Sequence, residues 1–424
     1  MSRRSPGGKG ESPAPTRRGF LVGAGGAIAG AGLAGGAEAA TATTPVATRL
    51  EPFRGRHQAG IVTPQQAHSY FLAFDLSTAK RDEVAGLLRS WTEAAARMAT
   101  GETAAALGAD RSAAPGDSGE ALDLPPSRLT LTFGFGAGLF TKGGKDRYGL
   151  AAQRPEALVD LPRFNGDQLV EAQTGGDLSL QACAEDPQVA FHAARQLARL
   201  AYGVAQVRWA QSGFLSATPG GGTPRNLMGF RDGTQVPEKL DEVVWVASEG
   251  PAWMRNGCYL VARRIRISLE HWDRSELDFQ EEVVGRHKYS GAPLGKKNER
   301  DPLDLDRTDA DGNPVIPETA HVRLAAAESN GGAQIFRRGY SYNDGVNFTA
   351  ERWPPWRQGM MYDAGLFFVA YQRDPRTGFI PIFEKMSRFD MMNQYVTHVG
   401  GGLFACPGGV AEGEFIGQRL FDSV

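Results

Sequence analysis

The chain has 424 residues, of which 41% are hydrophobic and 22% charged, as expected for a globular protein large enough for two domains. The formal net charge is −2 and basic residues form no stripe, which argues against nucleic acid as the main partner. The three cysteines, Cys183, Cys258 and Cys406, are far apart and match neither a disulfide framework nor a zinc site. We therefore expect buried free thiols.

Residues 1–39 have the pattern of a signal peptide. The first 20 residues contain five basic side chains, and a Gly- and Ala-rich apolar run and small residues at 37–39 follow. The run is too short and too weakly hydrophobic for stable membrane insertion. Arg17 and Arg18 precede it, which resembles a twin-arginine signal, with a Sec signal or a disordered tail as the alternative. This interpretation predicts a secreted or extracytoplasmic location, the twin-arginine export machinery as a partner, and a flexible lead-in at 40–56.

The first half of the mature chain alternates strand and helix patterns. Asp186 and Pro187 suit the N-cap and the first position of its second helix. The order strand, helix, strand, strand, helix, strand is that of a ferredoxin-like unit. The expected elements are strands at 69–77, 128–136, 175–185 and 207–215, and helices at 80–99 and 186–206.

The second half can be read in the same way, with a long polar insert at 287–332. A loop of that length in a compact domain is usually functional. We expect an α+β fold in which two ferredoxin-like domains, 57–220 and 221–424, pack as a barrel-like pair of antiparallel sheets. The expected elements are strands at 257–269, 333–342, 364–372 and 401–406, and helices at 270–286 and 380–396.

Two short stretches contain residues suited to chemistry. Asp232 lies between Gly229 and Gly233 in "GFRDG", where glycines let the backbone pass close to a bulky group. His321 lies in the polar insert, sixteen residues before Arg337. Taken singly, the acid is more often a turn residue and a loop histidine is more often solvated.

The combination of motifs resembles the dye-decolourising peroxidases, including their twin-arginine-exported, deferrochelatase-like branch. The resemblance covers nearly the whole mature chain and is specific as a set, although each motif is weak alone. It implies two ferredoxin-like halves around one heme b (iron protoporphyrin IX) per chain. The motifs are "HQAGI" (57–61), "LTLTFGFG" (129–136), "GFRDGT" (229–234), "HVRL" (321–324), "IFRRGYSY" (335–342) and "GLFFVAYQ" (365–372).

The resemblance implies a role for each matching residue. His321 is the implied axial ligand of the heme iron, with Asp390 as a less specific candidate acceptor for its second ring nitrogen. Asp232 is the implied distal acid and Arg337 the implied distal guanidinium, which also contacts the cofactor. Arg338 alternates to the other side of the strand, where a surface or interdomain salt bridge is expected. The other implied cofactor contacts are Gly229, Phe230, Gly233, Arg323, Leu366 and Phe368.

Two departures from the family pattern concern the heme propionates. The axial motif continues as "AAAES" rather than with an Asn-Pro-Arg-like segment, and Val236 stands where many members have Asn. The resemblance also implies that bulky dyes are oxidised through aromatic side chains that relay electrons. The candidates are Trp253, Trp353, Trp356 and Tyr342, although core packing is the commoner role of such residues.

Three functions follow from these patterns. The first is a secreted heme peroxidase that oxidises dyes, phenols or other organic reductants with hydrogen peroxide. The second is an exported heme-binding protein or deferrochelatase that serves iron acquisition. The third is a ferredoxin-like binding module without a cofactor. A homo-oligomer is left open.

Overall fold

The structure, a computed structural model, describes residues 48–216, 218, 222–350 and 358–423. The predicted leader at 1–39 lies outside these residues. Residues 44–424 form one compact unit, and the predicted domain boundaries at 57–220 and 221–424 stay predictions. Among the described residues, no helix is both long and apolar enough to cross a membrane.

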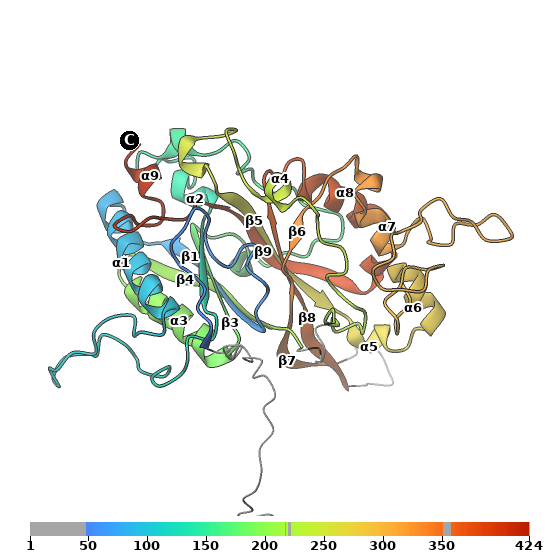
Figure 1. Ribbon diagram of the computed structural model, residues 1–424, viewed down its shortest axis with the longest axis horizontal. Helices are drawn as coiled ribbons and strands as arrows, with labels where there is room; N and C mark the ends of the chain where they lie inside the picture. The colour runs from blue at the N-terminus through green and yellow to red at the C-terminus, as the bar shows by residue number, and fades with distance from the viewer. Residues whose placement is uncertain (1–47, 217, 219–221, 351–357, 424) are drawn as a thin grey trace, which may run out of the picture. The chain divides into compact units, whose positions relative to one another are not determined.

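The described strands form one antiparallel sheet that closes on itself (Figure 1). Their order is β5-β9-β2-β3-β1-β4-β7-β8-β6, and β8 also pairs with β5, so that all except β6 form a barrel. The predicted α+β class and barrel-like sheet are confirmed. The strands are β1 (His68–Leu76), β2 (Thr130–Phe135), β3 (Leu178–Ala184), β4 (Ala205–Phe214), β5 (Cys258–Ile267), β6 (Phe336–Arg337), β7 (Tyr340–Ala350), β8 (Gln358–Gln372) and β9 (Val396–Cys406).

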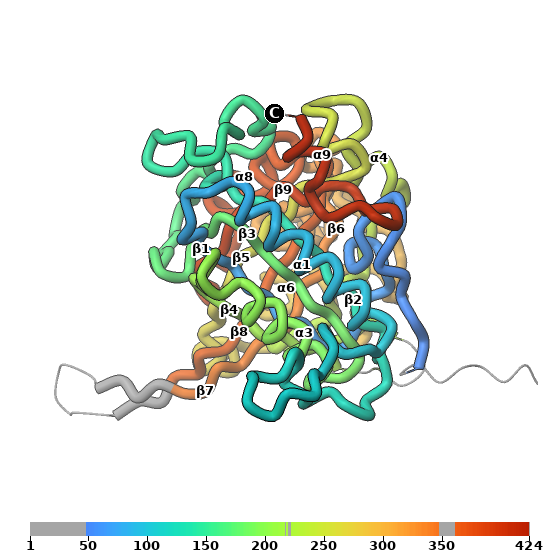
Figure 2. Tube along the Cα trace, turned by 90° about the vertical axis from the view of Figure 1, so that its left-hand side faces the viewer, coloured from blue at the N-terminus to red at the C-terminus, as the bar shows by residue number. Residues whose placement is uncertain are grey.

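Helices cover the outer faces of this sheet. In the first half, α1 and α3 lie side by side across the strands (Figures 1 and 2). In the second half, α7 and α8 lie next to each other. The helices are α1 (Arg81–Ala99), α2 (Ala137–Phe140), α3 (Pro187–Leu200), α4 (Leu240–Val244), α5 (Leu269–Trp272), α6 (Leu277–Val284), α7 (His321–Ala325), α8 (Phe379–Phe389) and α9 (Gln418–Phe421).

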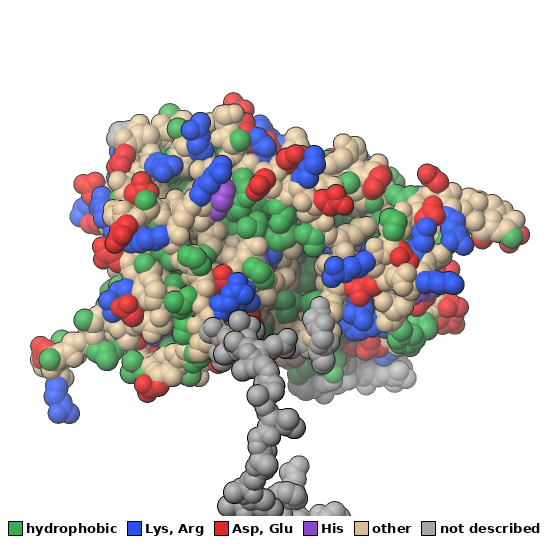
Figure 3. Space-filling model, viewed as in Figure 1, with side chains coloured by type: hydrophobic (Ala, Val, Ile, Leu, Met, Phe, Trp, Pro, Cys, Tyr) green, Lys and Arg blue, Asp and Glu red, His purple; other side chains and the backbone are tan. Residues whose placement is uncertain are grey.

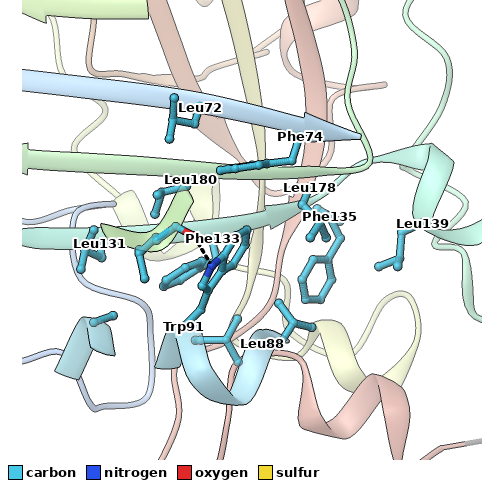
Figure 4. Close-up of a cluster of buried hydrophobic side chains, with 14 of the residues drawn as sticks. Leu72, Phe74, Leu88, Trp91, Leu131, Phe133, Phe135, Leu139, Leu178 and Leu180 are labelled. Atoms are coloured by element: carbon cyan, nitrogen blue, oxygen red, sulfur yellow. Dashed lines mark hydrogen bonds between the residues drawn. The ribbon is translucent and has the colours of Figure 1, made fainter. Parts of the chain in front are cut away.

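The first half follows its sequence pattern closely. Figure 4 shows Trp91 of α1 among the apolar side chains under the sheet, and its indole Nε1 donates to the backbone oxygen of Leu197 at 2.7 Å. Removing an aromatic side chain of this size from a core costs about 3–5 kcal/mol. The carboxylate of Asp186 caps α3 by accepting from the backbone N–H groups of Gln188 and Val189, as predicted. The helix ends at Leu200 rather than 206.

The last residues of the predicted lead-in contact the first half of the chain. The carboxylate of Glu51 pairs with the Arg128 guanidinium at 2.8 Å, and Phe53 is buried against Phe133. Both contacts fasten this segment to the start of β2. The three cysteines are buried and free, as expected.

The second half departs from its pattern in its helices. The helix predicted at 270–286 is two helices, α5 and α6, because the Gln280 side chain donates to the oxygens of Trp272 and Ser275 and caps the break. The helix predicted at 380–396 ends at Phe389, because Asp390 turns to cap the following short 3-10 helix through the backbone N–H of Met392.

Its strands also differ from the prediction, and β8 and β9 are longer than expected. The strand expected at 333–342 divides into β6 and β7, and β8 begins at Gln358 rather than 364. Within β8, Asp363 is balanced by the Arg264 guanidinium at 2.8 Å. Strand β9 begins at Val396 rather than 401 and includes glycines. A Cβ at Gly401 would lie 2.0 Å from the oxygen of Ala262, so only glycine fits there.

Candidate active site

His321 opens α7 within the long insert, where the sequence predicted a functional loop. Its Nδ1 lies 2.7 Å from Asp390 Oδ2, and the Asp390 side chain is only 3% exposed. The second oxygen, Oδ1, accepts from the Met392 backbone N–H at 2.8 Å. Asp390 is therefore a fixed, buried acceptor rather than an exposed carboxylate at the end of a helix. No hydrogen bond of His321 Nε2 is found among the described residues.

The "GFRDG" loop is shaped by its own polar groups. Asn226 Oδ1 accepts from the backbone N–H groups of Met228 and Phe230, and the Asp232 N–H donates to the oxygen of Pro224. Gly229 and Gly233 have φ values of 87° and 103°, a region that side chains rarely adopt. These bonds hold the Asp232 carboxylate at the end of the loop.

Asp232 and Arg337 meet across 105 residues of sequence. Arg337 lies on β6, which pairs with β8, and its Nη1 lies 3.2 Å from Asp232 Oδ1. The side chains are 36% and 26% exposed for Arg337 and Asp232. Both groups are thus paired with each other and still accessible from a cavity.

That cavity has a volume of about 910 Å³, which is within the usual range for cofactor sites. His321 and Asp390 line it, and so do Asp232 and Arg337. Its apolar lining includes Phe230, Ile267, Leu366, Phe368, Phe383 and Met386. The first half contributes Phe164, Asn165 and Asp167. A smaller cavity of about 50 Å³, with room for a few water-sized molecules, also borders Asp232 and Arg337.

Most of the predicted site residues are brought together here, but not all. Phe230, Gly233, Leu366 and Phe368 line the large cavity, whereas Gly229 and Arg323 do not. Gly229 packs against Lys288 instead. The Arg323 guanidinium donates to the oxygens of Ile316 and Leu305.

For two of the four candidate electron relays, the structure shows the core packing that the sequence analysis gave as the commoner role. Trp253 and Tyr342 are buried, at 3% and 0% exposure, and neither lines the cavity. Their packing role, which was the alternative, is the one observed. Trp353 and Trp356 lie outside the described residues.

Sequence reasoning missed two basic residues on the cavity wall, the buried Arg286 and the partly buried His398. Arg286 donates through Nη1 to the oxygens of Gly291 and Glu299, and burial lowers its pKa while Glu299 opposes that effect. His398 contacts the Phe383 ring edge-on, and burial, followed by the charge of Arg263, lowers its pKa to about 3. His398 is therefore neutral at physiological pH. No local pattern marks either residue, because each is buried by segments distant in sequence.

The molecular surface agrees with the charge count. On the face shown in Figure 3, acidic and basic side chains alternate without an extended patch of one sign.

Comparisons with known proteins identify the family. The family description "Dyp-type peroxidase, N-terminal" matches residues 58–215, and "Dyp-type peroxidase, C-terminal" matches residues 223–411. A dye-decolorizing peroxidase of Thermobifida fusca is 38% identical, over 97% of this chain and 98% of that protein. A deferrochelatase of Yersinia pestis is 35% identical, over 97% and 96%.

Solved structures lead to the same family. Ferric DtpA from Streptomyces lividans superposes with a TM-score of 0.80 at 42% identity, covering 90% of this chain and 100% of that one. The chain belongs to the Dyp-type peroxidase family and is a heme peroxidase enzyme.

Proposed function

We propose that the large cavity binds one heme b per chain, with His321 Nε2 as the axial ligand, and that the protein oxidises dyes, phenols or similar organic reductants with hydrogen peroxide. The observation that carries this proposal is the convergence of two pairs, His321–Asp390 and Asp232–Arg337, on one cavity of about 910 Å³. The dye-decolorizing relative and the ferric state of DtpA agree with it.

The residues present fit the cofactor. An axial histidine needs one ring nitrogen free and the other held by an acceptor, and His321 has this arrangement. The walls supply apolar contacts for a porphyrin through Ile267, Leu366 and Phe368. We propose Arg231 and Arg286, which line the cavity, as partners of the heme carboxylates in place of Arg323.

The distal pair has the groups that peroxide chemistry needs. Bound heme would supply the iron at which peroxide is reduced. Asp232 would accept a proton from one peroxide oxygen and return it to the other, which then departs. Arg337 would stabilise the negative charge that develops on the departing oxygen. Its existing bond to Asp232 keeps the two groups within reach of the same small molecule.

A second function is favoured by the deferrochelatases among the relatives, at 35% identity over most of both chains. We keep iron release from heme as the alternative, because the same cavity and axial ligand would serve it. Peroxide-independent formation of free protoporphyrin and ferrous iron would support this alternative. Peroxide-dependent oxidation of a dye without iron release supports the peroxidase.

The remaining proposals concern export and architecture. We propose that residues 1–39 direct twin-arginine export to an extracytoplasmic location, supported by Arg17–Arg18 and the apolar run. We also interpret the halves as a repeated ferredoxin-like unit. Its support is the strand order β2-β3-β1-β4 in one half and β7-β8-β5-β9 in the other.

The experiment that tests the cofactor proposal is substitution of His321. Wild type, His321→Ala and His271→Ala would be purified, supplied with heme and compared by Soret absorbance and heme-to-protein ratio. His271 is exposed and lies outside the cavity, so its variant is a matched control. We expect one heme per chain in wild type and control and loss of most heme in His321→Ala. Full occupancy of His321→Ala with an unchanged spectrum would show that the axial assignment is wrong.

A further inference from the structure

Arg338, next to Arg337, is buried in the fold. Its residue exposure is 1%, and its backbone N–H donates to the oxygen of Val369 on β8 at 2.7 Å. It borders neither the large nor the small cavity, whereas Arg337 borders both. The expected surface or interdomain salt bridge is therefore wrong, and the role of this guanidinium needs another explanation.

The guanidinium of Arg338 has only neutral partners. Nη1 donates to the backbone oxygen of Thr63, and Nη2 donates to Gln66 Oε1 at 3.0 Å. Nε has no partner. In the described ranges, no carboxylate forms an ion pair with Arg338. Burying a charge without an opposite charge costs free energy of folding. A neutral side chain would therefore make a purely structural contact with segment 63–66 at a lower cost.

The partners of Arg338 are themselves fixed to the first half of the chain. Gln66 is fully buried, and its Nε2 donates to the oxygen of Arg128 at 2.9 Å and to Thr130 Oγ1 at 3.0 Å. The adjacent Gln65 donates through Nε2 to the oxygen of Gly339 at 2.8 Å. Segment 63–66 therefore holds two consecutive residues, Arg338 and Gly339, that directly follow Arg337.

Arg337 needs such support, because its own strand is short. β6 has two residues, and the bond to Asp232 is the only side-chain hydrogen bond of Arg337 among the described residues. Its side chain is also 36% exposed to the cavity. The direction of this guanidinium is thus set mainly by where its backbone lies. A displacement of the backbone would separate Arg337 from Asp232 and from the peroxide between them.

We propose that Arg338 is a positioning residue for the distal pair: it ties the strand that carries Arg337 to segment 63–66 and thereby holds the Arg337 guanidinium beside Asp232. A forked guanidinium suits this role, because it reaches two acceptors in a fixed geometry. This inference rests on the proposed function, since it assigns Arg338 to the same heme site. It also makes the first half of the chain part of the distal machinery.

The test compares Arg338→Met and Arg338→Lys with Arg264→Met in the heme-loaded protein. Arg264 is a suitable control, because it is also buried but is paired with Asp344 and Asp363. The readouts are heme content, melting temperature, the cyanide dissociation constant of the ferric protein, and the second-order rate constant for peroxide across pH. Cyanide reports on Arg337 without turnover, since an anion on the distal side would accept from its guanidinium.

We expect Arg338→Met to keep its heme and to weaken cyanide binding and slow the peroxide reaction by about tenfold or more, the effect of losing one hydrogen bond to a charged group. The pH dependence of its second-order rate constant for peroxide should change as well. Arg338→Lys should recover part of both effects, and Arg264→Met should lower only the melting temperature. A structural role alone predicts lower melting temperatures with unchanged cyanide affinity and pH profile, and that result would overturn the proposal.

If Arg338→Met does not fold, Gln66→Met removes the acceptor of Nη2 and leaves the guanidinium in place. It should weaken cyanide binding in the same direction, and wild-type affinity would contradict the proposal. A wild-type protein that binds no heme would refute the proposed function instead, so the two failures are distinguishable.

Discussion

Asp390→Asn separates two roles of one buried carboxylate. Oδ1 of Asp390 caps the short 3-10 helix through the Met392 N–H at 2.8 Å, and an asparagine oxygen can do the same. Oδ2 faces His321 Nδ1 at 2.7 Å, and in asparagine an NH₂ group takes its place. Two donors would then face each other. The variant should fold normally and yet hold its heme less firmly.

The expected magnitude follows from the character of the lost bond. It joins an imidazole to a carboxylate whose side chain is 3% exposed, so it is a charge-assisted bond in a poorly solvated place. Such bonds contribute about 1.5–3 kcal/mol. At about 1.4 kcal/mol per factor of ten, heme affinity should fall roughly 10- to 100-fold, which is the range for residues that orient metal ligands.

The assay is heme transfer to excess apomyoglobin, followed by Soret absorbance. Asp390→Asn should release heme roughly 10- to 100-fold faster than wild type with nearly the same melting temperature. Asp390→Ala should release heme equally fast and also lose about 1 kcal/mol of stability, because the cap is gone. If Asp390→Asn released heme at the wild-type rate, Asp390 would only be a helix cap, and the reasoning about His321 would be refuted.

Three further changes probe other parts of the molecule. Asp232→Asn should keep its heme but react with peroxide about 10²–10⁴-fold more slowly, as measured by stopped-flow absorbance; an unaltered rate would transfer proton movement to another group. Asp186→Ala should lower the free energy of unfolding by about 1 kcal/mol in urea titrations, because two N–H groups of α3 lose their cap, whereas Asp186→Ser should not. His398 has a folded-state pKa of about 3, against 6.5 in the unfolded chain, so the unfolded chain binds its proton first and stability falls as pH decreases from 6.5 towards 3. Between pH 6.5 and 4.5 this loss is at most about 2.7 kcal/mol, at 1.36 kcal/mol per pH unit. In His398→Gln, the free energy of unfolding measured by denaturant titration should fall less steeply over this pH range. An unchanged dependence on pH would contradict the assignment.

The sequence predicted those parts of the fold that depend on local pattern. Strands β1 to β3 and helices α1 and α3 were found because apolar residues recur at the spacing of a strand or a helix. The prediction failed where a distant residue changes the local preference. Arg264 balances Asp363 within β8, and the oxygen of Ala262 requires Gly401 in β9. The break in the helix predicted at 270–286 is instead local, because Gln280 within it donates to the oxygens of Trp272 and Ser275.

The sequence likewise predicted some residues of the candidate site and missed the contacts of others. The resemblance to the dye-decolourising peroxidases identified His321, Asp232 and Arg337, whereas the local pattern alone favoured a solvated histidine and a turn acid. Arg323 does not line the cavity, and nothing in its sequence neighbourhood reveals that its guanidinium donates to the backbone oxygens of Ile316 and Leu305. Arg338 was assigned to a salt bridge because it alternates with Arg337 along the strand, and its actual acceptors are 275 and 272 residues away in the sequence.

The closure of the barrel explains why such distant contacts control the site. Within each half, neighbouring strands pair over many residues, but the two halves are joined by one residue pair at each seam, Phe214 with Ser341 and Phe135 with Ala405. Ser341 also lines both cavities. The bonds from segment 63–66 to Arg338 and Gly339 add to the single pair of the β4–β7 seam, next to the strand that carries Arg337. On this proposal, the distance between Asp232 and Arg337 depends on the hydrogen bonds by which segment 63–66 of the first half holds Arg338 and Gly339.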